Sequence, residues 1–162
     1  MAGIVTKVKL DVKLLDPFVQ ATLNMMKTQV QLEADCGKPY LKKNQELPVD
    51  IAGLIDLQNS DLPGSIAICF SREVFLKIYE MMVGDKHDSI NQEIQDAASE
   101  ILNIIFDQAK TALLEKGIRL ERAIPKVLVG PDLKLKLAQK GPAMILPFTS
   151  PIGPFHMEVV FK

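Results

Sequence analysis

Three polar side chains recur at helical spacing in the middle of the chain: Asp96, Glu100 and Asn103. At about 100° per residue, spacings of four and three place a carboxylate, a second carboxylate and an amide on one face of a helix, on successive turns. Side chains held in the middle of a stiff helix are candidates for positioning a reactive atom. Taken alone, the same pattern is also typical of the solvated outer face of an amphipathic helix.

A long amphipathic helix over residues 88–117 is expected to carry this stripe. Asp88 or Ser89 is expected to cap its start, and Gly117 to end it. Ile104 lies at the edge of the polar stripe, beside Asn103, where an apolar side chain can mark a docking surface. The stripe comprises Glu93, Asp96, Glu100, Asn103, Asp107 and Thr111. The opposite face, expected to pack on a sheet, comprises Ile94, Ala98, Ile101, Leu102, Ile105, Ala109, Ala112 and Leu113.

The remaining helices and strands are expected in segregated groups rather than in regular alternation. Strict alternation over residues 8–14 predicts a strand, and Asp16-Pro17 predicts the start of a helix that runs to about Val30. Segregated elements favour an α+β fold, with long helices packed on a largely antiparallel sheet, in a single domain over residues 1–162. The other expected elements are an irregular segment at 31–47, a hairpin at 49–57 and 65–70, a helix at 72–82 capped by Ser71, and extended segments at 118–129, 133–137, 143–148 and 155–161.

The charge and the apolar content of the chain argue against nucleic-acid binding and membrane insertion. The chain has 162 residues, with 19 Lys and Arg against 20 Asp and Glu, so its net charge of -1 argues against a broad electrostatic grip on nucleic acid or an anionic membrane. No apolar run approaches the roughly 18 residues that span a bilayer, and the first residues do not form a signal peptide. We expect a soluble, cytoplasmic protein.

Local motifs for metal, nucleotide or covalent chemistry are missing. The chain has no phosphate-loop or dinucleotide-binding glycine motif and no nucleophile elbow. Cys69 lies in an apolar run and is expected to be a small buried hydrophobe, not half of a disulfide, which fits a reducing compartment. His87 is expected on the surface, and His156 at a rim or satisfied in the interior. Neither histidine forms a local metal motif with Cys36 or Cys69, although folding can bring distant ligands together.

Further motifs surround the polar stripe and extend over most of the chain. Glu100 and Asn103 form an ExxN signature, with Asp96 four positions before the glutamate, and a Pro-x-x-x-x-Gly motif follows at Pro125 and Gly130. Glycine-containing strand motifs occur at 53–55 and 64–71, and a Gly-x-Phe turn at 153–155. Together these motifs resemble the CheX-like members of the CheC/CheX/FliY family of chemotaxis phosphatases.

The resemblance implies a CheX-like fold and hydrolysis of the aspartyl phosphate of a response regulator similar to CheY. Asn103 would orient the attacking water, and Glu100 would pair with the regulator's lysine. Asp96, Ile104 and Asp107 would contribute to partner binding. The regulator would supply Mg²⁺ and the phosphoryl pocket, so no cofactor is expected on this chain, and the resemblance also implies a homodimer.

Two positions depart from the family pattern. Asp107 stands where family members often carry glycine, and its carboxylate could repel an acidic partner or point to solvent. Leu23 stands where a second asparagine would fall, so one site per chain is expected, and the expected strand at 8–14 lies outside the core resemblance. Two other functions stay open: a non-catalytic module that binds a receiver domain through the same helix face, and a purely structural dimer subunit.

Overall fold

Three helices dominate one side of the fold. The computed structural model describes residues 2–42, 49–57, 64–121, 125–130 and 143–161, with residues 2–13 and 161 described by their backbone alone. The helices are α1 (Ala2–Met25), which continues into a π-helical turn (Met26–Val30), α2 (Arg72–Val83) and α3 (Gln92–Glu115). No helix in the described ranges is both long and apolar enough to cross a membrane. The cytoplasmic location stays a prediction.

A seven-stranded sheet forms the second layer, in the order β1-β6-β7-β4-β3-β5, with β2 also paired to β6. Every described pair is antiparallel, which confirms the expected fold class. The hairpin predicted around residues 49–70 is confirmed as β3 and β4, while the segment expected at 133–137 lies outside the described residues. The strands are β1 (Asp35–Cys36), β2 (Tyr40–Leu41), β3 (Ile51–Asp56), β4 (Gly64–Phe70), β5 (Lys126–Val129), β6 (Ala143–Thr149) and β7 (Phe155–Phe161).

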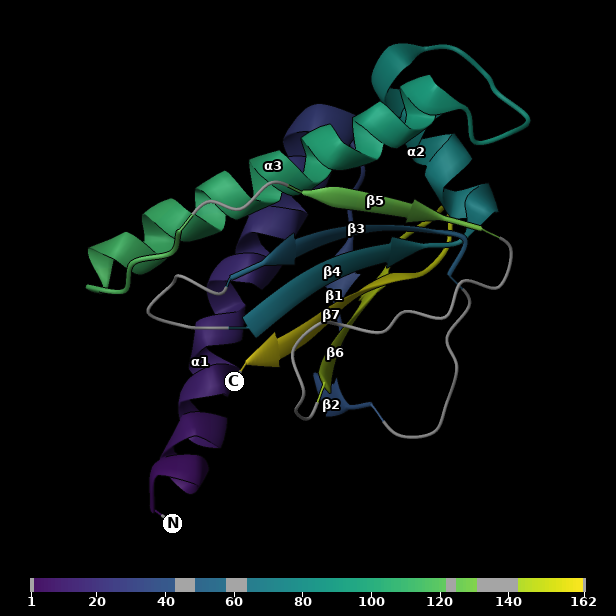
Figure 1. Ribbon diagram of the computed structural model, residues 1–162. Helices are drawn as coiled ribbons and strands as arrows, with labels where there is room; N and C mark the ends of the chain where they lie inside the picture. The colour runs from purple at the N-terminus through teal and green to yellow at the C-terminus, as the bar shows by residue number, and fades with distance from the viewer. Residues whose placement is uncertain (1, 43–48, 58–63, 122–124, 131–142, 162) are drawn as a thin grey trace.

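The helices cover one face of this sheet (Figure 1). Successive strand residues point to opposite faces, so Ile66 and Ile68 of β4 join the helices in the main core, whereas Ala67 and Cys69 belong to a small cluster on the other face. The helix layer approaches the sheet closely at Gly53, where a Cβ atom would lie 3.0 Å from Leu102 Cδ2. α3 therefore rests directly on β3.

A Gly53→Val variant is expected to unfold with a free energy lower by about 1–3 kcal/mol, because added methyl groups would push Leu102 and α3 away from the sheet. Chemical denaturation measures this difference. The matched control is Gly130→Val, since a Cβ atom at Gly130 meets nothing within 4 Å and its stability should change by no more than about 0.5 kcal/mol. Equal stability of the two variants would contradict the close contact of α3 with β3.

The N-terminal expectations were wrong in two respects. Residues 8–14 lie inside α1 and do not form a strand, and Asp16-Pro17 lies within the helix and does not start it. A short alternating segment also fits helical spacing, because Val8, Val12 and Leu15 recur at intervals of four and three. Pro17 costs the helix one backbone hydrogen bond. Burial of Leu15 and Phe18 beside it offsets that cost.

The caps of the other two helices follow the sequence closely. The Ser71 side chain accepts a hydrogen bond from Val74 N at 3.3 Å, as predicted, and Gly84 ends α2 in the left-handed conformation. The start of α3 was misplaced: Asn91, not Asp88 or Ser89, is its cap, with Oδ1 accepting from Ile94 N at 3.1 Å. Gly117 follows α3 with φ +81°, as expected.

Candidate functional site

The polar stripe of α3 points away from the sheet. The carboxylates of Asp96, Glu100 and Asp107 are exposed, and Asn103 is half-buried. The opposite face is fixed in the core by Ile94, Ala98, Ile101, Leu102, Ile105, Phe106, Ala109 and Leu113. This face matches the prediction except that Phe106 was missed and that Ala112 is only half-buried. Packing of so many side chains makes α3 a rigid support for the stripe.

Glu100 and Asn103 lie on adjacent turns of α3, three residues apart, near the middle of its length. Within the described part of the chain, neither side chain takes part in a hydrogen bond or an ion pair. A carboxylate and an amide are thus presented side by side with their polar atoms available to a partner.

The two flanking acids differ in their surroundings. Asp96 Oδ1 accepts a hydrogen bond from Gln92 Nε2 at 2.9 Å, one turn earlier on the same helix. The backbone carbonyl of Asp107 accepts a hydrogen bond from Thr111 Oγ1 at 3.0 Å, while its carboxylate is exposed one turn beyond Asn103. Both carboxylates add negative charge to the stripe on either side of Glu100 and Asn103.

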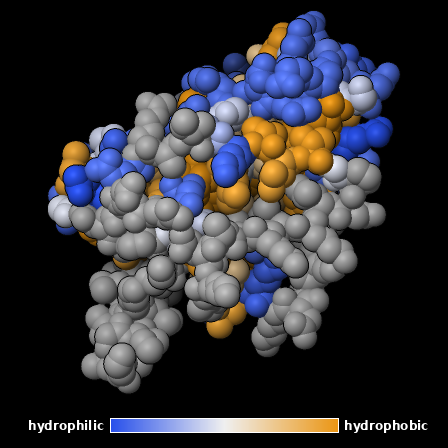
Figure 2. Space-filling model, in the orientation of Figure 1, coloured by the Kyte–Doolittle hydropathy of each residue, from blue (hydrophilic) through white to orange (hydrophobic). Residues whose placement is uncertain are grey.

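Ile104 is less exposed than its position beside the stripe suggested. It is half-buried and packs against the main core, so only part of its side chain could touch a partner. Next to α3, the edge strand β5 presents Val129, which is 40% exposed. Figure 2 shows an apolar area over β5, below the hydrophilic side chains that cover the start of α3 and the α2–α3 connection.

The first turn of α3 is tied to α2. Tyr79 Oη donates a hydrogen bond to Glu93 Oε2 at 3.3 Å. Burial of the Tyr79 ring, followed by the negative charges of Glu93 and Asp85 and the hydrogen bond to Glu93, raises the pKa of the phenol. Glu93 therefore belongs to the contact between the two helices.

Three glycines of the sequence motifs take part in packing or hydrogen bonding around the sheet. Gly53 permits the close approach of Leu102, and Gly130 N donates to Asp50 O at 3.0 Å, which fastens the end of β5 beside the start of β3. Gly153, in the turn between β6 and β7, has φ +129°, and a Cβ atom there would lie 2.8 Å from Val74. Gly53 is therefore required for its small size, and Gly153 for both its backbone conformation and its small size.

One cluster that sequence reasoning did not assemble lies on the sheet face away from the helices. Cys69, His156 and Glu158 are all buried there, and they are the one group of metal-ligand side chains that the described residues bring together. Burial, together with the charge of Lys42, lowers the pKa of His156 to about 4, so the imidazole is neutral. Cys69 is 0% exposed, which confirms it as an interior residue. Burial and then the charge of Glu158 raise the pKa of its thiol.

Comparison with known families gives one match, to "Chemotaxis phosphatase CheX", over residues 51–149. This range contains β3, β4, α2, α3, β5 and β6, and therefore the whole polar stripe. The CheY-P phosphatase CheX of Thermotoga maritima is 23% identical over 128 residues, which cover 78% of this chain and 82% of that protein.

Solved structures agree with this match. Chemotaxis protein CheX from Vibrio vulnificus superposes with a TM-score of 0.86 and 31% identity, covering 93% of this chain and 99% of that one. The CheX-CheY-BeF3-Mg²⁺ complex from Borrelia burgdorferi contains a chain with a TM-score of 0.72 and 24% identity, covering 91% and 97%, respectively, and shows the same fold.

Proposed function

Because this chain belongs to the chemotaxis phosphatase CheX family, we propose that it hydrolyses the aspartyl phosphate of a CheY-like response regulator through Glu100 and Asn103 of α3. In this proposal the Asn103 amide enters the regulator's active site and holds the attacking water. Glu100 pairs with a lysine of the regulator and sets the docking position. Asp96, Ile104 and Asp107 lie around this pair and contact the same partner.

One observation carries the proposal. Glu100 and Asn103 lie on neighbouring turns of a helix whose other face is buried, and neither side chain is hydrogen-bonded to another described residue. A water must be held in line with the phosphorus for efficient attack, and a rigid amide can do so. An acyl phosphate is already labile, so the reaction requires no covalent intermediate on this chain. A hundredfold acceleration corresponds to about 2.7 kcal/mol, which one positioned hydrogen-bonding group can supply.

The metal in the reaction is assigned to the partner. In the Borrelia burgdorferi complex CheX is found together with CheY, BeF3 and Mg²⁺. We propose that the regulator likewise brings Mg²⁺ and the phosphoryl pocket to this chain. The stripe itself offers carboxylates and an amide, which would serve recognition and water positioning.

A Glu100→Ala variant tests the docking role. Phosphate release from a phosphorylated CheY-like regulator is expected to show a KM about tenfold higher, equivalent to about 1.4 kcal/mol of lost binding, with kcat largely kept, because the lost contact is made before and during the reaction. Glu80→Ala is the matched control, since Glu80 is an exposed glutamate on α2, away from the stripe. If the wild-type chain does not accelerate release at all, the phosphatase proposal is wrong.

A non-catalytic binding module is the second candidate, and the exposed carboxylate of Asp107, one turn beyond Asn103, favours it. A negative charge there would weaken the approach of a phosphoryl group while leaving the rest of the helix face able to bind. Titration of regulators with this chain distinguishes the two candidates. Saturable binding without faster phosphate release selects the binding module, and Asp107→Gly should then restore turnover.

The homodimer is also part of the proposal, and it rests on family membership alone. Light scattering during size-exclusion chromatography should give twice the mass of the 162-residue chain. A monomer at all concentrations would contradict it without affecting the assignment of Glu100 and Asn103.

A further inference from the structure

The cluster of Cys69, His156 and Glu158 is assembled by strand register. Cys69 of β4 stands opposite His156 of β7, and Ala67 stands opposite Glu158. Cross-strand partners and residues two apart share a face of a sheet, so all three side chains project on one side. The neighbouring residues Ile68, Met157 and Val159 belong to the main core under the helices, which places the cluster on the face opposite to α3.

We propose that Cys69, His156 and Glu158 bind one Zn²⁺ ion. A thiolate, an imidazole and a carboxylate together are a typical zinc donor set, and three protein ligands leave a fourth position for water. The ligand atoms all lie within 4.8 Å of one another. Ligand atoms of a tetrahedral zinc site are about 3.4–3.6 Å apart, given bond lengths of about 2.0–2.3 Å, so small side-chain rotations would close the site.

All three side chains of the cluster are buried. Cys69, His156 and Glu158 are 0%, 8% and 3% exposed, and a buried carboxylate needs a neutralising partner. Without metal, Lys42 serves this purpose, with Nζ 2.9 Å from Glu158 Oε1. The His156 ring forms no hydrogen bond with any other described residue, so a nitrogen lone pair is available to a metal.

Charge balance supports a divalent ion. On binding, the Cys69 thiol releases its proton to solvent, and the resulting thiolate and the Glu158 carboxylate carry two negative charges, which Zn²⁺ neutralises. The Lys42 side chain is 28% exposed, so its ammonium can move toward water when the metal takes over the carboxylate. The proposal does not rest on the phosphatase function, since the two sites occupy opposite sides of the sheet.

The first test uses the wild-type full chain, freed of metal by a chelator. Titration with Zn²⁺ is expected to saturate at one ion per chain, and Zn²⁺ should raise the thermal midpoint, because a ligand that binds the folded state stabilises it. Co²⁺ used as a probe in the same site should give visible bands of a tetrahedral ion and a thiolate-to-cobalt charge-transfer band. Lack of saturable binding, or Co²⁺ binding without the thiolate band, would overturn the proposal.

The second test uses variants, and the chain supplies matched controls because it has only two cysteines and two histidines. Cys69→Ala and His156→Gln are each expected to weaken Zn²⁺ binding by at least about tenfold. Cys36→Ala and His87→Gln should bind like the wild type. If the control variants lose binding as much as the site variants, the ligands are assigned wrongly. Circular dichroism of each variant confirms folding, and the Co²⁺ spectrum of the wild type remains decisive if a site variant is unfolded.

Discussion

An Asn103→Ala variant is expected to dephosphorylate a CheY-like regulator about 100-fold more slowly than the wild-type chain, a loss of about 2.7 kcal/mol of transition-state stabilisation. Asn103 is half-buried in the middle of α3, and its neighbour Leu102 is fixed against Gly53 of the sheet. The helix backbone that carries the amide is therefore fixed before the partner arrives, which favours the orientation of a water. Alanine keeps the helix but has no group to hold that water.

The substitution separates catalysis from folding. Alanine has a higher helix propensity than asparagine, so Asn103→Ala should not lower the stability of α3. Asn103→Asp tests the amide more finely, because it keeps the size of the side chain but removes the NH₂ donor and adds a negative charge facing the phosphoryl group. Thr111→Ala is the control on the same stripe and should keep the wild-type rate. Equal rates for Asn103→Ala and the wild type would refute the catalytic assignment.

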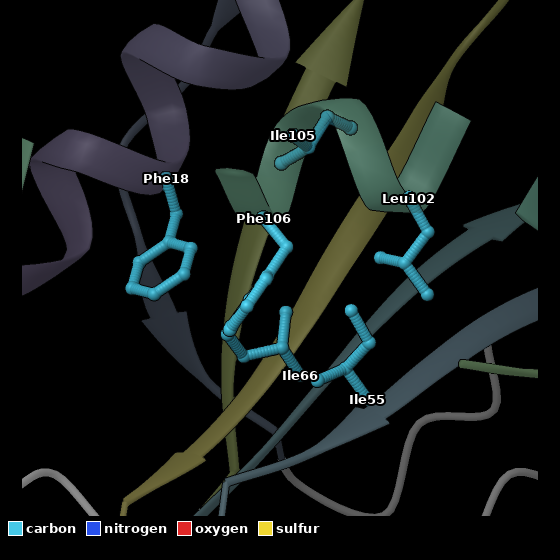
Figure 3. Close-up of a pocket in the computed structure, with 6 residues that line it drawn as sticks. All are labelled: Phe18, Ile55, Ile66, Leu102, Ile105 and Phe106. Atoms are coloured by element: carbon cyan, nitrogen blue, oxygen red, sulfur yellow. The ribbon is translucent and has the colours of Figure 1, made fainter. Parts of the chain in front are cut away.

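A Phe106→Ala variant is expected to lower the free energy of unfolding by about 3–5 kcal/mol, out of a total of about 5–15 kcal/mol for a domain. Phe106 is 2% exposed. Figure 3 shows it directed from α3 toward Ile55 and Ile66 of the sheet, with Phe18 of α1 beside it. The hollow between these side chains is too small for a water molecule. Removal of the ring would enlarge it into a cavity that stays dry, because only apolar side chains line it.

Urea unfolding at equilibrium measures this effect as a shift in the midpoint. Leu114→Ala is the matched control on the same helix, because Leu114 is 58% exposed and its truncation should change stability by no more than about 0.5 kcal/mol. A loss below 1 kcal/mol for Phe106→Ala would mean that α3 is not anchored at this point. The rigidity that the proposed function requires of Asn103 would then lack support.

Sequence reasoning was most successful where the signal is local. The spacing of Glu100 and Asn103 placed both side chains on the outer face of α3, and the apolar positions of the opposite face followed with few errors. Ser71 marked the start of α2 correctly, because cap chemistry involves residues within one turn. The antiparallel pairing of β3 with β4 confirms the predicted hairpin.

Errors arose where packing between distant elements decides the outcome. The apolar residues of segment 8–14 fit the period of a strand and that of a helix. The segment is helical in the structure, and Leu14 and Leu15 are buried in the helix layer. Phe106 lies at the margin of the apolar arc of α3, and it is buried beside Phe18 of α1. Ile104 was expected to be more exposed, but it packs on the core.

By itself the sequence determined the long helix, its polar stripe and the antiparallel character of the sheet, because periodicity, caps and turns depend on residues only a few positions apart. Only the tertiary structure decided that Cys69, His156 and Glu158 meet on one face, since their meeting depends on the register of β4 with β7. Strand register is set when the whole sheet closes over its core, and no local pattern around either segment contains that information.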